Sequence, residues 1–179
     1  MQGTYRFPVV CDGRVVFVCE DDVWSCPVEG GRAERLTALH GRPGRLVAHP
    51  TQPLVAFTSN EEGILDVSLL DLRTGEIRRL THHGGARVAG WTPDGEVAFS
   101  SSRDRPFLRD EHLFAVHPEG GTVRDLGLGI GSTVWWKGPL TLVGRYRDEL
   151  ASWRDYRGGR RGEVWLCETV IARFDSAMP

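Results

Sequence analysis

The sequence is poor in lysine: Lys137 is the only one among 22 basic residues, which are balanced by 24 acidic residues. The resulting net charge of −2 argues against a protein that binds nucleic acid over its whole surface, because such proteins are usually strongly basic. The N-terminus also lacks a basic region followed by an apolar run, and no apolar stretch approaches the roughly 18–20 residues of a membrane helix. We therefore expect a cytoplasmic protein that has no signal peptide and no contact with a membrane.

The sequence also lacks the motifs of metal, cofactor and nucleophile sites. It has no CxxC pair and no histidine pair at zinc spacing, so we interpret Cys11, Cys19, Cys26 and Cys167 as buried free thiols. No G-x-S-x-G turn, phosphate-binding loop or dinucleotide fingerprint is present. The run HHGG at 82–85 is similar to an oxyanion element, but it follows a strand end, which indicates a turn between repeats. The sequence therefore predicts no catalytic residue, no metal site and no cofactor.

What the sequence does contain is a repeat of short strand-like segments. Apolar runs rich in Val, Phe, Trp and Leu alternate with turns of Gly, Pro and Asp, which is the pattern of β-strands. The tripeptide RLT occurs at residues 35–37 and 79–81, and Leu126 takes the same place 46 residues after Leu80. Further markers recur with a similar spacing in equivalent strands of successive repeats. One strand of each repeat carries Trp24, Leu69 or Phe114, and the strand before it carries Phe17, Phe57, Phe99 or Leu142.

A period of about 40–50 residues that holds four short strands is typical of a β-propeller blade. One such sheet cannot bury both of its faces alone, so it has to stack against neighbouring blades. We predict an all-β fold of four blades, each of four antiparallel strands, at about residues 4–39, 44–83, 86–127 and 132–174, in a partial or open propeller. A β-sandwich also has short strands, but it gives no reason for the repeat. The large aromatic residues are expected to pack between blades: Trp24, Phe57, Trp91, Phe99, Phe114, Trp135 and Trp165.

Three stretches resemble known propeller families. The third repeat contains WTPDGEVAFSSS and resembles TolB-type repeats, in which a Pro-Asp-Gly turn precedes an apolar strand ending in F-S-S. The segments VCDGRVVFVCEDDVWSCPVEGG near the start and SWRDYRGGRRGEVW near the end together resemble the N-terminal propeller of tricorn proteases. The residues of the second segment that match the family run are Trp153, Tyr156, Arg157, Gly158, Gly159, Arg161, Gly162 and Trp165.

The tricorn resemblance implies a longer protein than this chain. Tricorn-like proteases are serine proteases that degrade oligopeptides, and they combine two propellers, a helical segment, a PDZ-like domain and a catalytic domain. The resemblance gives this chain about four blades of the six-bladed first propeller, with a role as peptide channel, filter or assembly domain. The implied partners are peptides and other domains or subunits of the protease. Because the family pattern fades after Trp165, we expect a truncation or frameshift near Cys167.

The Arg-Gly stretch at residues 152–165 holds the one candidate binding site, at Trp153, Tyr156, Arg157, Arg160 and Arg161. We place this stretch between the second and third strands of the fourth blade. Three interpretations stay open: a loop fixed by Arg–carboxylate pairs, a loop that faces peptides or a partner, and an RNA-binding arm. The stretch is a single copy in front of a strand, whereas RNA-binding arms are long and repetitive, so we expect no nucleic-acid partner.

Two functions outside proteolysis are kept as alternatives. One is a stand-alone, TolB-like propeller that binds a protein partner, and the other is nucleic-acid binding through the Arg-Gly loop. In every case, an open arc of four blades exposes the outer faces of its first and last sheets. We therefore expect the chain to self-associate or to form an oligomer.

Overall fold

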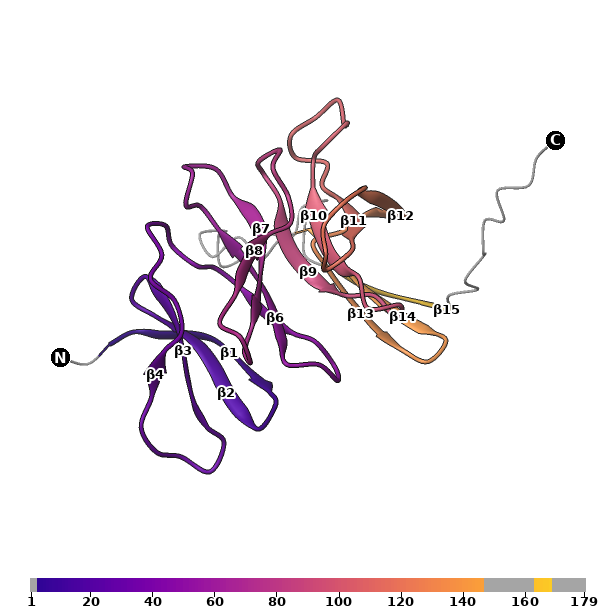
Figure 1. Ribbon diagram of the computed structural model, residues 1–179. Coiled ribbons are helices and arrows are strands. Elements are labelled where there is room, and N and C mark those ends of the chain that lie inside the picture. Colours follow the sequence, from indigo (N-terminus) through magenta and orange to yellow (C-terminus); the bar gives the residue numbers. More distant parts are fainter. Residues whose placement is uncertain (1–2, 147–162, 169–179) are drawn as a thin grey trace, which may run out of the picture.

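The computed structural model describes residues 3–146 and 163–168, and the regular elements in these residues are β-strands (Figure 1). The apolar runs are short and end at Gly, Pro and Asp turns, so the chain reverses direction after each strand. Among the described residues, no helix is long and apolar enough to cross a membrane.

The strands form four antiparallel sheets, each ordered as in the chain. The first sheet consists of β1 (Tyr5–Cys11), β2 (Arg14–Cys19), β3 (Asp22–Pro27) and β4 (Glu34–Arg35). The second consists of β5 (Leu46–Ala48), β6 (Leu54–Ser59), β7 (Asp66–Asp71) and β8 (Ile77–Arg79). The third consists of β9 (Arg87–Trp91), β10 (Val97–Ser101), β11 (His112–Val116) and β12 (Arg124–Ile130). The fourth holds, in the described part of the chain, β13 (Thr133–Lys137), β14 (Leu140–Arg145) and β15 (Glu163–Glu168).

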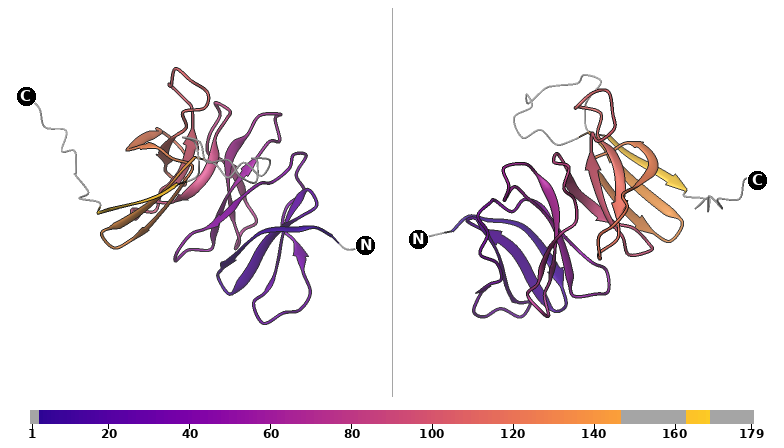
Figure 2. Two further views of the ribbon diagram at one scale, coloured as in Figure 1. Left: turned by 180° about the vertical axis from the view of Figure 1, so that it is seen from behind. Right: turned by 45° about the horizontal axis from the view of Figure 1, so that its top comes forward.

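The four sheets stand side by side as blades of a propeller, as Figures 1 and 2 show from three directions. The first strands of neighbouring blades contact each other, β1 with β5, β5 with β9 and β9 with β13. These four strands are therefore the inner strands of the propeller. The first blade lies at one end of the row and the fourth at the other. The all-β propeller fold is thus confirmed, while the blade limits 4–39, 44–83, 86–127 and 132–174 stay predictions.

Three hydrophobic clusters join the blades, one at each interface between neighbours. Phe57 is fully buried between the first and second blades, where Val16, Val18 and Leu70 surround it. Phe99 is fully buried between the second and third blades and stacks on Phe114 at 5.8 Å between ring centroids. The smaller third cluster consists of Ala89, Ala98, Leu113, Val134 and Val143. Side-chain packing between sheets therefore holds the row together, as expected for blades that cannot bury both faces alone.

The aromatic prediction is right for four residues and wrong for three. Phe57, Phe99, Phe114 and Trp91 are buried between blades. Trp135 is 53% exposed because it lies on the outer face of the fourth blade, against which no described sheet packs. Trp165 is 50% exposed, on the last strand of that blade. Half-buried Trp24 lies opposite Phe17 on the outer face of the first blade.

The strand pairing also corrects the sequence alignment of the repeats by one residue. Trp24 pairs with Phe17, and Phe114 pairs with Phe99, but the residue that pairs with Phe57 is Ser68. Leu69, which shares the 45-residue spacing, therefore points to the opposite face of its strand. Leu69 packs against the third blade, so a prediction of its facing from the spacing alone is wrong.

The RLT repeat has a physical reason, because its threonine closes the outer edge of the blade. In the second blade, Thr81 Oγ1 donates to Asp66 Oδ1 at 2.6 Å and accepts from Val67 N at 2.9 Å. Arg79 binds the same carboxylate at 2.7 Å, and Gly84 N donates to it at 3.3 Å at the entry to the next blade. Equivalent contacts recur in the first blade among Asp22, Val23, Arg35 and Thr37.

Candidate functional site

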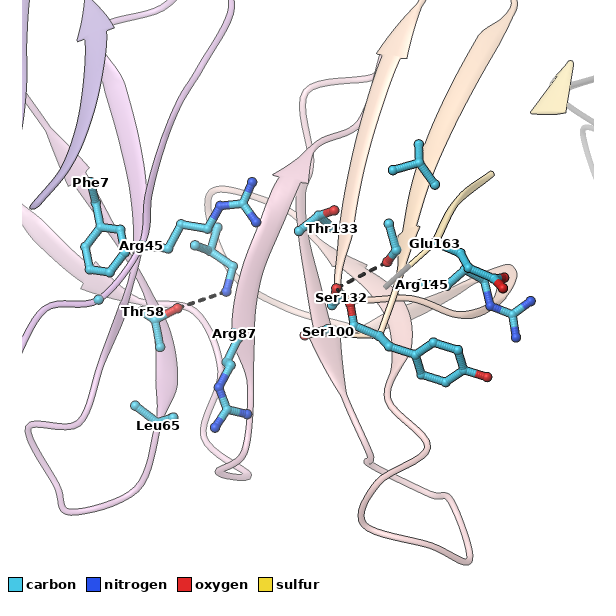
Figure 3. A pocket seen from close by; sticks show the side chains of 15 residues that line it. Phe7, Arg45, Thr58, Leu65, Arg87, Ser100, Ser132, Thr133, Arg145 and Glu163 are labelled. Atoms are coloured by element: carbon cyan, nitrogen blue, oxygen red, sulfur yellow. Dashed lines mark hydrogen bonds between the residues drawn. The ribbon is translucent and has the colours of Figure 1, made fainter. Parts of the chain in front are cut away.

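Residues from all four blades line an open cavity of about 620 Å³ beside the inner strands, which we call the axial cavity. It lies at the ends of the blades where the second strands finish and the third strands begin. The residues that line it are Phe7, Gly44, Arg45, Thr58, Leu65, Arg87, Val88, Ser100, Ser132, Thr133, Gly144, Arg145, Tyr146, Glu163 and Val164. Figure 3 shows Phe7 and Arg45 on one side of this cavity and Arg145 and Glu163 on the other.

The propeller repeat places equivalent residues of successive blades around the cavity. Arg45, just before β5, lies opposite Thr58. The backbone N of Thr58 donates to the carbonyl of Arg45 at 3.3 Å. Arg87, at the start of β9, pairs with Ser100 in the same way. Thr133 takes this place at the start of β13 in the fourth blade. The second and third blades therefore carry an arginine at the same position of the repeat, and the fourth blade carries a threonine there.

Arg87 is held by a buried carboxylate below the cavity wall. Its Nη1 lies 3.2 Å from Glu111 Oε1, and the Glu111 side chain is 8% exposed. Ser100 Oγ donates to the other carboxylate oxygen of Glu111 at 3.4 Å. Burial lowers the pKa of the Arg87 guanidinium from its ordinary value. The paired carboxylate opposes this desolvation, because a nearby negative charge favours the charged form of arginine.

Arg145 is held by an aromatic ring instead. Its guanidinium carbon lies 4.0 Å from the centroid of the Trp165 ring, within the range of a cation–π interaction. Trp165 Nε1 in turn donates to Glu163 Oε2 at 3.1 Å. The backbone pairing of β14 with β15 sets this arrangement, since Arg145 lies directly opposite Glu163. The planar guanidinium is thus fixed at the cavity wall by stacking.

Hydrogen bonds between neighbouring strands close the walls of the cavity. Thr58 Oγ1 accepts from Val88 N at 3.0 Å and so connects the second blade to the third. Ser132 Oγ donates to the carbonyl of Tyr146 at 2.9 Å within the fourth blade (Figure 3). These bonds fix the backbone on both sides of the cavity, so its walls consist of hydrogen-bonded strands.

The residues proposed from the Arg-Gly stretch, Trp153, Tyr156, Arg157, Arg160 and Arg161, lie outside the described residues. The chain enters this stretch after β14 and leaves it before β15, which are the second and third strands of the fourth blade. Their role as a binding loop stays a prediction. Sequence reasoning missed Arg45, Arg87 and Arg145. The signal for the first two was present, because each stands immediately before the apolar part of an inner strand.

The HHGG run joins β8 to β9 and is therefore a turn between blades, as predicted. His83 Nε2 lies 3.2 Å from Ser101 Oγ, the geometry that a serine nucleophile and its base require. However, Ser101 is 1% exposed and its Oγ accepts from Arg103 N at 3.1 Å. Burial and the charge of Arg103 lower the pKa of His83, and among the described residues no carboxylate hydrogen-bonds to its ring. In addition, the described residues contain no group of three or more His, Cys, Asp or Glu that would hold a metal ion.

The chain is similar to proteins of one family over nearly its whole length. Residues 2–176 match the model of the tricorn protease N-terminal beta propeller domain. The tricorn protease homolog 1 of Streptomyces coelicolor is 35% identical over 164 residues, which cover 90% of this chain and 15% of that protein. A putative tricorn-like protease N-terminal subunit of Sulfurisphaera tokodaii is 27% identical over 172 residues, which cover 93% of this chain and 87% of the relative.

Solved structures give the same result for the fold. The crystal structure of the tricorn protease superposes with a TM-score of 0.81 at 26% identity, over 93% of this chain and 17% of that chain. TolB from Acinetobacter baumannii superposes with a TM-score of 0.65 at 18% identity, over 93% of this chain and 41% of TolB, a likeness in fold alone. The chain thus spans less than a fifth of the tricorn protease and of the Streptomyces relative. By its sequence and its fold, the chain belongs to the family of tricorn protease N-terminal β-propeller domains.

Proposed function

We propose that the chain is the non-catalytic propeller part of a tricorn-like serine protease and that oligopeptides pass through or bind in its axial cavity. The observation that carries this proposal is the cavity itself, which residues of all four blades line in a domain of the tricorn family. Concave sites with a few placed polar groups are the usual location of ligand binding. An extended peptide fits such an opening because guanidinium and hydroxyl groups from several blades can bind its main chain.

Hydrolysis of the peptide is proposed to occur outside the described residues. Among the described residues, the serine that hydrogen-bonds to a histidine is Ser101, which is buried and whose hydroxyl already accepts a backbone hydrogen bond. A nucleophile needs access to the substrate and a base that is itself oriented by a third group. The Sulfurisphaera tokodaii relative is named an N-terminal subunit and has nearly the extent of this chain. This supports the idea that the chain works with other domains or subunits that carry the catalytic serine.

An assembly role is the second part of the proposal. The outer face of the fourth blade exposes Trp135 and Leu166, and the outer face of the first exposes Tyr5 and Val10. Apolar faces of this kind mark surfaces that bind other protein. We infer that further blades, domains or subunits cover them. All four cysteines are free thiols, although only Cys11 is buried and the prediction of burial is wrong for Cys19, Cys26 and Cys167. Their free state supports a cytoplasmic location for this assembly.

Filling the cavity is expected to weaken peptide binding. Thr133 lines the cavity at the start of β13, so Thr133→Trp places an indole ring where the peptide would lie. We expect the dissociation constant of a fluorescent hexapeptide, measured by anisotropy with the full chain, to rise about tenfold or more. Thr122→Trp is the matched control, because Thr122 is exposed in the turn between β11 and β12, at the opposite end of the blade. Equal binding by wild type and Thr133→Trp would argue against the cavity as the peptide site.

A further inference from the structure

Two aromatic residues that line the axial cavity, Phe7 and Tyr146, have a backbone conformation that bulky residues rarely adopt. Their φ angles are 52° and 61°, in the left-handed region that favours glycine and, less strongly, asparagine and aspartate. The other non-glycine residues of the described chain with positive φ are Asp12, Glu20 and Asp104, which lie in connections between strands. The conformation of the two aromatic residues therefore needs a separate explanation.

The sequence around Phe7 breaks the regular pairing of β1. Pro8 has no backbone N–H to donate to β2, and the register of β1 against β2 shifts between Arg6 and Val9. One extra residue of β1 therefore stands opposite β2, and a bulge of this kind re-aims the side chains beside it. Figure 3 shows the Phe7 side chain at the wall of the axial cavity, on the same side as Arg45.

Tyr146 lines the same cavity from the other end of the row of blades. It directly follows β14 in the fourth blade, whereas Phe7 belongs to the first. Ser132 Oγ donates to the carbonyl of Tyr146 at 2.9 Å, which fixes the backbone at this point. The guanidinium carbon of Arg145 lies 5.6 Å from the centroid of the Tyr146 ring, within the range of a cation–π interaction. The two end blades thus each contribute one aromatic residue to the cavity.

Packing inside the protein does not account for these two conformations. Phe7 is 43% exposed and Tyr146 is half-buried. Neither residue belongs to the three hydrophobic clusters that join the described blades. Residues in strained conformations persist where the surrounding structure holds them, and they cluster at ligand sites. An accessible aromatic ring at the wall of a cavity offers a contact surface for an apolar group.

We propose that Phe7 and Tyr146 contact apolar side chains of bound peptides, so that the axial cavity selects peptides with aromatic or large aliphatic residues. This inference rests on the proposed function and adds the chemical class of the peptide. Leu65 and Val164 add apolar surface to the same lining. Burial of an apolar side chain against such surfaces is favourable whatever the charge of the peptide. The selectivity is therefore expected in peptides that carry no charge.

The test compares three fluorescent hexapeptides with the full chain by anisotropy. All three are uncharged and amidated, and they differ only at two positions, which hold phenylalanine, leucine or serine. We expect the phenylalanine and leucine peptides to bind about tenfold more tightly than the serine peptide, because burial of one large apolar side chain changes the affinity by about that factor.

The variants Phe7→Asn and Tyr146→Asn remove one ring each and keep the backbone, because asparagine tolerates the left-handed conformation. We expect each variant to weaken binding of the phenylalanine and leucine peptides about tenfold, while binding of the serine peptide changes less than about twofold. The urea midpoint is expected to stay at the wild-type value or to rise, since relief of the backbone strain offsets the lost contacts.

Tyr5→Asn is the matched control for both variants. Tyr5 lies on the same strand as Phe7 and is 70% exposed, but its ring contacts Phe17 at 5.6 Å on the outer face of the first blade. We therefore expect Tyr5→Asn to bind all three peptides as the wild type does.

The possible outcomes separate this inference from the proposed function. Equal affinity for all three peptides, lost in Thr133→Trp, would overturn the apolar selectivity and leave peptide binding in the cavity standing. No binding of any peptide would overturn both. A lower urea midpoint in Phe7→Asn and Tyr146→Asn, with equal loss of all three peptides, would also overturn the inference, because the two residues would then serve the fold alone. Selective loss of the apolar peptides in both variants, with Tyr5→Asn unchanged, supports it.

Discussion

Replacing Phe99 with alanine is expected to lower the free energy of unfolding by about 3–5 kcal/mol, the largest effect of any single change considered. Phe99 is fully buried between the second and third blades. Its ring stacks on Phe114 at 5.8 Å and lies 5.9 Å from the ring of His83. The substitution removes these contacts and leaves a cavity at the middle interface of the row, so the loss combines the transfer and cavity terms.

Phe107→Ala is the matched control for this prediction. Phe107 is 64% exposed in the loop between β10 and β11, so the same substitution there is expected to change the stability by no more than about 0.5 kcal/mol. Both variants are compared with wild type by urea unfolding at one protein concentration. Because domains of this size are commonly stable by about 5–15 kcal/mol, the Phe99 variant loses a large share of that stability. Equal midpoints and slopes for the two variants would show that the interface between the second and third blades contributes little.

The purified chain is expected to self-associate at micromolar concentration through the outer faces of its end blades. Trp135, Leu142 and Leu166 lie opposite one another across β13, β14 and β15 on the face that no described sheet covers. Trp135 and Leu166 are 53% and 64% exposed. Stacking of such a sheet face on a second sheet is the interaction that joins the blades within the chain, so another copy offers a ready partner.

A single charge on the outer face of the fourth blade is expected to dissociate the self-associated chain into monomers. Leu166→Glu places a carboxylate on the face, where a stacked sheet would have to desolvate it. Leu108→Glu is the matched control, because Leu108 is 86% exposed at the tip of the β10–β11 loop, away from the sheet face. Light scattering after size exclusion should give the 19.9 kDa monomer for Leu166→Glu and a larger mass for wild type and Leu108→Glu. A wild-type monomer at micromolar concentration would contradict the prediction.

The blade repeat was readable from the sequence because each blade uses the same local chemistry. The RLT tripeptide marks the threonine that binds Asp22 or Asp66 at the blade edge, so its spacing reports the period directly. The facing of individual side chains was harder to predict, because a one-residue difference in register turns a side chain to the other face of a strand. Leu69 shows this, since it shares the spacing of Trp24 and Phe114 but packs on the opposite face.

Burial and the cavity depend on contacts between blades, which a single repeat does not encode. Trp135 carries the aromatic signal of an interface residue, yet its exposure follows from the absence of a neighbouring sheet among the described residues. Arg45 and Arg87 occupy equivalent positions of the repeat and could be recognised in the sequence. That both line one cavity depends on how the inner strands are arranged in space. Arg145 comes from a second strand and shares no repeat signal with them, so only the packing of the fourth blade brings it there.

The most direct test of the central claim is to map where a photoreactive oligopeptide attaches to the purified chain and whether it stays intact. We expect mass spectrometry to recover uncleaved peptide cross-linked to the inner-strand side of the axial cavity, near Arg45, Arg87 or Thr133. These residues line the cavity, and the described residues contain no accessible nucleophile with an oriented base. Cleaved peptide, or cross-links confined to the turns at the opposite end of the blades, would contradict the account.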